Sequence, residues 1–252
     1  MTTDTSAVAA EYAEARERDW TDFLGRRGPL PDYWGLWEQR SFNWKVPVEY
    51  IQPLGIETPA TFDALQPLFD RLAAMEEVEL VPVPWLHLTW CRVGFLRAAD
   101  IMWSQVESFY ANSAPRLRRI PPTTLHLGGL SVAEGERIYL GMDDGGMYRE
   151  ARRQARLGVP KVNDVMKEDP LITPDGDRFV PQVDIAYFTG RGSRERVVET
   201  LEPFRSLVVG DIALTHLKMA RMPIQPHSHY EDLDVVAEMQ MLGDDHRKGY
   251  HN

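Results

Sequence analysis

The sequence predicts an α+β fold in which short strands alternate with amphipathic helices. Residues 83–95 and 179–187 alternate apolar and polar side chains with a period of two, which is typical of half-buried strands. Other segments carry apolar residues at helical spacing. The order strand, helix, polar-faced strand recurs in each half of the chain. These observations predict a mixed fold with one polar-faced strand, called here a motif strand, in each half.

The segment ahead of the main body is expected to form an addition of its own, covering residues 1–42. Apolar side chains recur at helical spacing over residues 5–26, which predicts a helix that docks on the body. Residues 29–40 read as a linker that contains Trp34 and Trp37. Two interpretations of these rings are open, either core anchors of an irregular segment or an aromatic wall beside a site.

The main body is expected to span residues 43–242, followed by a polar tail at residues 243–252. Pro47 indicates an edge position or a bulge in the first strand, and Pro67 should kink the first helix or move its start. Besides the motif strands, the expected strands are residues 43–52, 78–83, 123–130, 136–142, 208–219 and 232–242. The expected helices are residues 61–75, 98–111, 147–157 and 193–205. Residues 158–178 form a long loop, which we expect to cover the site because such loops are uncommon unless they are lids or disordered.

The first motif strand reads V-P-W-L-H-L-T-W-C-R-V-G-F. Its alternation places His87 and Thr89 on one face, together with Cys91 and Val93, and places Leu86, Leu88 and Trp90 on the other. An imidazole in such a position can move a proton while the neighbouring hydroxyl binds an oxyanion. A histidine at the rim of a sheet beside a solvated threonine is the alternative.

The second motif strand reads F-V-P-Q-V-D-I-A-Y. Its alternation predicts one face made of Val183, Ile185 and Tyr187 and an opposite face made of Gln182, Asp184 and Ala186.

Together the two stretches resemble the motifs P-x-W-L-H-x-T and F-x-P-H-V-S-L-A-Y of the 2H phosphoesterase superfamily. Within it they are most similar to the bacterial 2′-5′ RNA ligase-like, or cyclic phosphodiesterase, proteins. The resemblance covers about residues 44–242, with specific motifs only at these two places. It implies a bilobal α+β fold with two pseudo-symmetric antiparallel sheets and outer helices around a central groove. It also implies two histidines that act as general base and general acid, and two hydroxyls that hold the phosphate.

The second motif departs from the family pattern at the two residues that would do the chemistry. Gln182 stands where the family has His, and glutamine cannot exchange a proton near neutral pH. Asp184 stands where the family has Ser, and a carboxylate repels a phosphodiester by about 4 kcal/mol at 4 Å and an effective dielectric constant of 20. That repulsion would be relieved if Asp184 were protonated, bound to a metal or paired with an arginine. Either Asp184 forms a salt bridge in an abandoned site, or it is a general base or electrostatic partner with His87 as the opposing acid.

We therefore expect His87 and Asp184 to be catalytic and Thr89, Gln182, Tyr187 and His126 to bind the substrate. His126 has the competing interpretation of a solvated or hydrogen-bonded side chain. His216 is expected to be structural because Lys218 stands where the pattern needs a hydroxyl. His227 and His229 are expected to lie in a polar turn, since no Cys or carboxylate cluster completes a ligand set. No metal site and no cofactor are expected.

Composition limits the partners. The 252 residues include 38 acidic and 28 basic side chains, a formal charge of −10, which argues against non-specific binding of long nucleic acid. The chain has one cysteine, and no stretch reaches the length of about 20 apolar residues that spans a membrane. We expect a cytoplasmic protein that binds a small-molecule or nucleotide-like ligand.

Three functions remain open on these grounds. The first is an enzyme on a 2H phosphoesterase-like scaffold whose acid–base chemistry is altered and acts on a small molecule, in a biosynthetic role. The second is a 2′,3′-cyclic phosphodiesterase or 2′-5′ RNA ligase-like enzyme of reduced activity. The third is a non-catalytic module that binds a nucleotide-like ligand. Several Arg or Lys residues around Thr89 would favour phosphate, whereas an acidic or aromatic groove would favour the first function.

Overall fold

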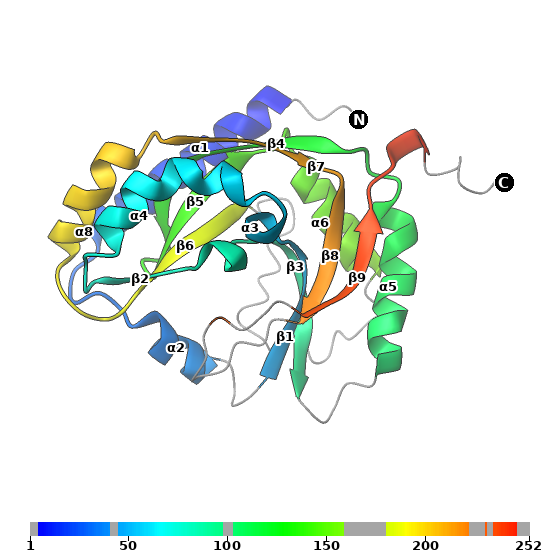
Figure 1. Ribbon diagram of the computed structural model, residues 1–252, viewed down its shortest axis with the longest axis horizontal. Helices are drawn as coiled ribbons and strands as arrows, with labels where there is room; N and C mark the ends of the chain where they lie inside the picture. Colours follow the sequence, from blue (N-terminus) through cyan, green and yellow to red (C-terminus); the bar gives the residue numbers. More distant parts are fainter. Residues whose placement is uncertain are drawn as a thin grey trace.

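The strands of this computed structural model form two antiparallel sheets, which lie side by side in Figure 1. The four-stranded sheet has the order β3-β1-β8-β9, and the five-stranded sheet has the order β2-β6-β5-β4-β7. The structure describes residues 5–40, 45–97, 103–158, 180–221, 230 and 234–245. The α+β fold with two antiparallel sheets is confirmed.

The four-stranded sheet consists of β1 (Lys45–Gln52), β3 (Leu88–Arg97), β8 (His216–Arg221) and β9 (Asp234–Gln240). The five-stranded sheet consists of β2 (Val78–Leu80), β4 (Thr123–Ala133), β5 (Arg137–Asp143), β6 (Gln182–Phe188) and β7 (Val208–Leu214). The helices are α1 (Thr5–Gly25), α2 (Tyr33–Arg40), α3 (Leu54–Glu57), α4 (Gln66–Leu72), α5 (Trp103–Leu117), α6 (Met147–Gly158) and α8 (Arg194–Leu201). Short 3-10 helices are η1 (Pro59–Leu65), η2 (Val83–Trp85) and η4 (Glu202–Phe204).

Two prolines shape the first elements of the body. Pro67 lies in the first turn of α4 and moves the start of that helix, as predicted, so the preceding turns form the 3-10 helix η1. β1 carries an irregularity between Val48 and Glu49, next to Pro47, which confirms the predicted bulge. From Val48 onward β1 pairs with both β3 and β8, so that part of the strand is interior, whereas the described pairing of Pro47 itself is with β3 alone.

Two other expectations are corrected. The linker at residues 29–40 contains the helix α2, whose Tyr33 and Trp34 side chains pack against the body. The expected strand at residues 208–219 is two strands, β7 and β8, divided at Thr215 because they belong to different sheets. Residues 159–178 of the expected cover, His227, His229 and the tail beyond residue 245 lie outside the described residues.

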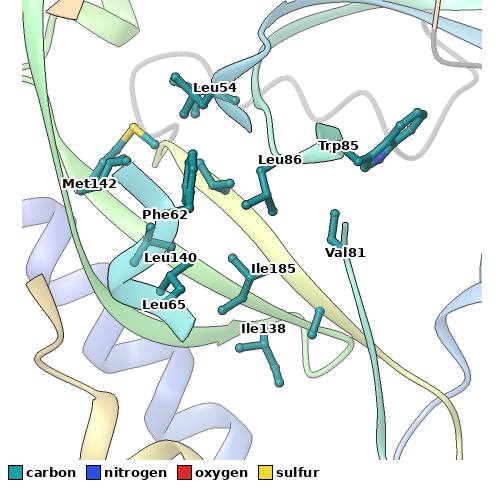
Figure 2. Close-up of a cluster of buried hydrophobic side chains, with 14 of the residues drawn as sticks. Leu54, Phe62, Leu65, Val81, Trp85, Leu86, Ile138, Leu140, Met142 and Ile185 are labelled. Atoms are coloured by element: carbon teal, nitrogen blue, oxygen red, sulfur yellow. The ribbon is translucent and has the colours of Figure 1, made fainter. Parts of the chain in front are cut away.

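The two faces of the five-stranded sheet are covered by different helices. Ile138, Leu140 and Met142 of β5 pack with the η1 residues Phe62 and Leu65, as Figure 2 shows. On the opposite face, the hydroxyl of Tyr139 donates a hydrogen bond of 2.7 Å to Asp19 in α1. Because neighbouring residues of a strand point to opposite faces, α1 lies on the face away from η1.

The chain passes twice from one sheet to the other without an intervening α-helix. Residues 81–87 connect β2 to β3, and Thr215 connects β7 to β8. The first crossing ends at His87 and the second leads directly into His216. A single buried hydrophobic cluster includes residues from both sheets, so the sheets share one core.

Candidate active site

His87 directly precedes β3 and has a defined orientation. The predicted strand at residues 83–95 is corrected at its start, because residues 83–85 form the 3-10 helix η2 and β3 begins at Leu88. Leu86 and Leu88 are buried on one side, while His87 and Thr89 are half-buried, which confirms the predicted alternation at the start of this strand. Nδ1 of His87 lies 2.6 Å from the carbonyl oxygen of Trp85. Because a carbonyl only accepts, Nδ1 carries the hydrogen, and Nε2 is the nitrogen able to take up a proton. Among the described residues, that Nε2 has no hydrogen-bond partner.

The register of β1 places a cation on the same face as Thr89. Ile51 pairs with Thr89 of β3 on one side and with Lys218 of β8 on the other. Thr89 and Lys218 therefore share a face, about 10 Å apart across two strand spacings. The Lys218 ammonium lies 2.7 Å from a carboxylate oxygen of Glu57, so this cation is already paired.

A bulge in β6 changes which residues of the second motif stand together. Tyr139 of β5 pairs with Asp184, and its neighbour Ile138 pairs with Ala186, so Ile185 is an extra residue in β6. The register then puts Tyr187 on the face of Gln182 and Asp184. The expectation that Tyr187 shares a face with Val183 and Ile185 is wrong, because the extra residue shifts the alternation by one. Ala186 correspondingly leaves the face of Asp184.

Asp184 is held in an ion pair with an arginine of the neighbouring strand. One of its carboxylate oxygens lies 3.0 Å from Nη1 of Arg137, and the other accepts a hydrogen bond of 3.2 Å from the amide of Gln182. The Asp184 and Arg137 side chains are only 20% and 23% exposed. Burial alone would lower the pKa of Arg137, but the carboxylate of Asp184 raises it above its ordinary value. Arg137 also contacts Glu134 at 3.2 Å. The arginine pairing that would relieve repulsion of a phosphate is therefore present, but two carboxylates share the cation.

An aromatic cluster made of Tyr33, Trp34, Trp85, Tyr187 and Tyr230 runs between the two motif strands. Tyr33 stacks on Tyr187 with ring centroids 3.9 Å apart, and Trp34 meets the edge of Tyr187 at 5.4 Å. Tyr230 lies 5.9 Å from Trp34 and 5.8 Å from Trp85. Trp85 in turn meets the His87 ring at 5.9 Å. The cluster thus connects His87 to the strand that carries Asp184, and β3 and β6 also contact each other directly.

The rings of this cluster are neutral and partly shielded from water. Burial raises the pKa of Tyr187 well above its ordinary value, and burial likewise raises the pKa of Tyr230. Both phenols therefore remain protonated at neutral pH. Trp34 serves as an anchor, since it packs against the core, and it also forms part of this aromatic wall.

The structure places His126 away from this cluster. It stands on β4 with its side chain 57% exposed, and its Nδ1 lies 2.8 Å from Asp211 of β7. The hydrogen bond to Asp211 raises the pKa of His126. Both residues line an open cleft of about 420 Å³ beside α1, together with Arg16 and Arg205. His126 is separated from Gln182 by the intervening strand β5.

Sequence reasoning missed Arg137 and the polar cluster around His216. Arg137 is the first residue of the largely apolar strand β5, and only the register of β5 and β6 brings it to Asp184. His216 contacts Glu57 of α3, a residue 159 positions away in the chain. No local pattern marks either contact. Among the described residues, no group of three or more His, Cys, Asp or Glu side chains is arranged to hold a metal ion.

None of the helices in the described part of the chain is long and apolar enough to cross a bilayer.

Similarity to known proteins is found at the level of structure. No protein-family model matches the sequence, and no curated protein matches it significantly. The structure is similar to TT0787 of Thermus thermophilus, with 16% identity and a TM-score of 0.58 over 79% of this chain and 99% of that one. It is also similar to E. coli LigT in complex with ATP, with 14% identity and a TM-score of 0.52 over 78% of this chain and 98% of that one. A protein described as a phosphoesterase matches at 12% identity and a TM-score of 0.54, with 78% and 98% of the chains covered.

These proteins are matched over nearly their whole length, whereas about a fifth of this chain has no counterpart in them. E. coli LigT is also seen with 3′-AMP and with NADP+. The two-sheet arrangement and its match to LigT and the phosphoesterase agree with the two sequence motifs. The chain therefore has the 2H phosphoesterase fold.

Proposed function

We propose that this protein is an enzyme that carries out acid–base chemistry on a small molecule, with a reaction altered from phosphodiester cleavage and a biosynthetic role. His87 is the proton-transfer residue, and Asp184 is its electrostatic partner. The observation that carries the proposal is the binding of both Asp184 oxygens by Arg137 and Gln182, on the strand face that also carries Tyr187 of the aromatic cluster leading to His87. The sequence left two functional roles open for Asp184, general base or electrostatic partner, and the proposal assigns it the second.

His87 suits the role of general base. Its Nδ1–H is fixed by the carbonyl of Trp85, so Nε2 presents a lone pair toward a substrate. Thr89, two residues further on, can donate its hydroxyl hydrogen to an oxygen of the same substrate.

The charges nearby favour a neutral or cationic substrate. Arg137 is paired with Asp184 and Glu134, and Lys218 is paired with Glu57. A phosphate would have to compete with a carboxylate at either cation, and Asp184 itself would repel it. The aromatic cluster offers a stacking surface for a ring-bearing molecule. Thr89, Gln182 and Tyr187 are the proposed substrate contacts, and His126 has no role in this scheme.

The second candidate is a 2′,3′-cyclic phosphodiesterase or 2′-5′ RNA ligase-like enzyme of reduced activity. Arg137 and Lys218 favour it, since each places a cation near a motif strand. The binding of ATP and 3′-AMP by E. coli LigT, which has the same fold, also supports it. A non-catalytic module that uses the aromatic cluster to bind a nucleotide-like ligand is the third candidate.

The test compares the wild type with His87→Ala, Asp184→Asn and the double variant Gln182→His/Asp184→Ser. We expect slow hydrolysis of 2′,3′-cyclic AMP by the wild type, because one proton-transfer residue of the family pair is missing. The double variant should gain about 10²-fold or more, since it adds a histidine at the family's position and removes the carboxylate that repels phosphate. In a thermal-shift assay, neutral adenosine should raise the melting temperature of the wild type at least as much as 3′-AMP does.

The outcomes separate the candidates. Rapid, His87-dependent hydrolysis by the wild type would select the phosphodiesterase. If adenosine binds but His87→Ala does not change the residual turnover, the binding module would be selected. Stronger binding of 3′-AMP by Asp184→Asn than by the wild type would support the electrostatic role given to Asp184. Equal binding of 3′-AMP by Asp184→Asn and by the wild type would contradict that role.

A further inference from the structure

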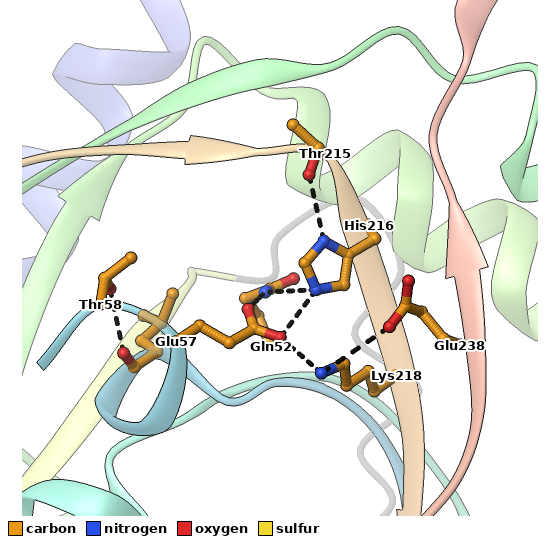
Figure 3. Close-up of polar contacts among 8 residues, drawn as sticks. Gln52, Glu57, Thr58, Thr215, His216, Lys218 and Glu238 are labelled. Carbon is orange, nitrogen blue, oxygen red and sulfur yellow. Dashed lines mark hydrogen bonds and ion pairs between the residues drawn. The ribbon is translucent and has the colours of Figure 1, made fainter.

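A polar cluster around His216 joins residues of α3, β1, β8 and β9 (Figure 3). Nε2 of His216 lies 2.7 Å from Oε1 of Glu57, which also accepts a hydrogen bond of 2.7 Å from Lys218. The other oxygen of Glu57 accepts a hydrogen bond from the side-chain amide of Gln52. Nδ1 of His216 lies 3.1 Å from the hydroxyl of Thr215. The arrangement is a carboxylate–imidazole pair whose second ring nitrogen faces an exposed hydroxyl.

The sheet register brings Lys218 and His216 of this cluster to the face that carries Thr89 and His87. Thr89 and Lys218 both pair with Ile51 and so share a face. His87 and His216 each stand two residues before them, so alternation gives both imidazoles the same face. The burial agrees, because both histidines are half-buried while Leu88 and Leu217, the residues that follow them, are buried. Extending the register by one residue places both histidines beside Pro53, at the end of β1, about 10 Å apart from backbone to backbone.

One buried acceptor beside this pair is unsatisfied. Gln52 is 2% exposed, and its Oε1 has no hydrogen-bond partner among the described residues. A buried acceptor of this kind usually has a partner, and a donor group on a bound ligand would supply one.

We propose that His216 is the second proton-transfer residue of this enzyme, that Glu57 positions it, and that the substrate lies across β1 between His216 and His87. This inference rests on the proposed function and supplies the acid that Gln182 cannot provide. It takes the second histidine from the same sheet as His87.

The proton balance follows from the two tautomers. Nε2 of His87 takes a proton from a hydroxyl or water as that oxygen bonds to the electrophilic atom of the substrate. Protonated His216 gives its Nδ1 proton to the leaving group as the bond between that group and the same atom breaks. Nε2–H of His216 stays hydrogen-bonded to Glu57 throughout, because a carboxylate only accepts. The neutral His216 and protonated His87 then return to their starting states by exchange with water.

Glu57 is suited to hold an imidazolium. Burial alone would raise the pKa of Glu57, but hydrogen bonds from His216 and Lys218 lower it below its ordinary value. The carboxylate is therefore ionised at neutral pH, as the orienting carboxylate of a histidine pair must be. Lys218 and, at 3.8 Å from it, Glu238 complete the charged groups of the cluster.

The first measurement needs no substrate turnover. Nitrogen-15 spectra of the histidine rings at alkaline pH should show opposite neutral tautomers, with hydrogen on Nε2 of His216 and on Nδ1 of His87. Addition of adenosine should shift the signals of both histidine rings, and the two shifts should follow the same saturation curve. Glu57→Gln should alter the His216 signals, whereas Glu238→Gln, which also neutralises a partner of Lys218 but does not touch His216, should leave them in place.

The second measurement uses the residual hydrolysis of 2′,3′-cyclic AMP. His216→Gln should lower kcat by about 10²-fold or more in the wild-type background and remove one limb of the pH–rate profile. In the Gln182→His/Asp184→Ser background the loss should be much smaller, because Gln182→His supplies a histidine from the other sheet. If His216 has only a structural role, His216→Gln should lower kcat by the same factor in both backgrounds.

Each result decides between the two proposals. Adenosine shifts confined to His87, or equal losses in both backgrounds, would overturn the role of His216 and leave the proposed function standing. No shift of either ring with adenosine or 3′-AMP, together with turnover unaffected by His87→Ala, would overturn the proposed function itself.

Discussion

At the scale of single residues, carboxylates set the chemistry of this protein. Asp184 neutralises Arg137, and Glu57 neutralises Lys218 while it holds His216. These two cations near the motif strands are thereby occupied. His87 differs, because its ring is oriented by a backbone carbonyl, which leaves the lone pair on Nε2.

Glu57 should make stability depend on pH in a defined direction. Its pKa in the folded protein is below the ordinary value of 4.5, so its contribution is present above that pH and is lost as the pH falls through the folded value. Glu57→Gln should therefore lower the free energy of unfolding at pH 7 by about 1–3 kcal/mol, and the difference should shrink below pH 4.5.

Urea unfolding of the wild type and Glu57→Gln, at pH 7 and below pH 4.5, measures this difference in the free energy of unfolding. Glu238→Gln is the matched control, because its carboxylate is 49% exposed and lies 3.8 Å from Lys218. It should change stability by less than about 1 kcal/mol. A loss from Glu57→Gln that is equal at both pH values would contradict the assignment.

At the scale of elements, the positions of the site residues depend on a few close approaches and irregularities. The bulge at Ile185 brings Tyr187 to the face of Asp184. The approach of α3 to η2 fixes the segment that leads into His87, since the amide of Gly55 donates a hydrogen bond of 2.8 Å to Leu86.

Gly55→Ala should disrupt that approach. A Cβ at this position would lie 1.6 Å from the carbonyl oxygen of Val83, so α3 and η2 must move apart. We expect a loss of stability of about 2 kcal/mol or more, of the size seen when a core is overpacked. Gly25→Ala is the control, because an added Cβ there meets nothing within 4 Å. Denaturant unfolding of both variants gives the answer, and equal midpoints would show that the contact is dispensable.

The alternation of apolar residues predicted most strands and helices, because burial of one face imposes a period that the sequence displays. His87 and Thr89 were found on one face in this way. The extra residue at Ile185 and the division at Thr215 were not predictable, since neither interrupts the apolar pattern. The partners of Asp184 and His216 depend on strand register between distant segments, and register leaves no local mark in the sequence.

At the scale of the whole molecule, the two sheets behave as one packed body. Their buried residues form a single cluster that also includes Trp20 and Phe23 of α1. Phe23 stacks on Phe188 of β6 at 5.6 Å. The N-terminal helix is therefore part of the core.

Unfolding should accordingly be a single transition that includes α1. Tryptophan fluorescence and far-ultraviolet circular dichroism should report the same midpoint. Phe23→Ala should lower the midpoints seen by the two probes equally, corresponding to a loss of about 3–5 kcal/mol in the free energy of unfolding. Leu24→Ala, at a neighbouring side chain that is 50% exposed, is the control and should have little effect. Separate melting of α1 ahead of the sheets would show that the helix is only an accessory.

The two direct crossings between the sheets have a mechanical consequence. Each is a short connection, and one ends at His87 while the other leads into His216. A rotation of one sheet against the other would turn about these connections and swing both imidazoles at once. The spacing of the rings is thus coupled to the angle between the sheets, and a molecule gripped between the rings would lock that angle.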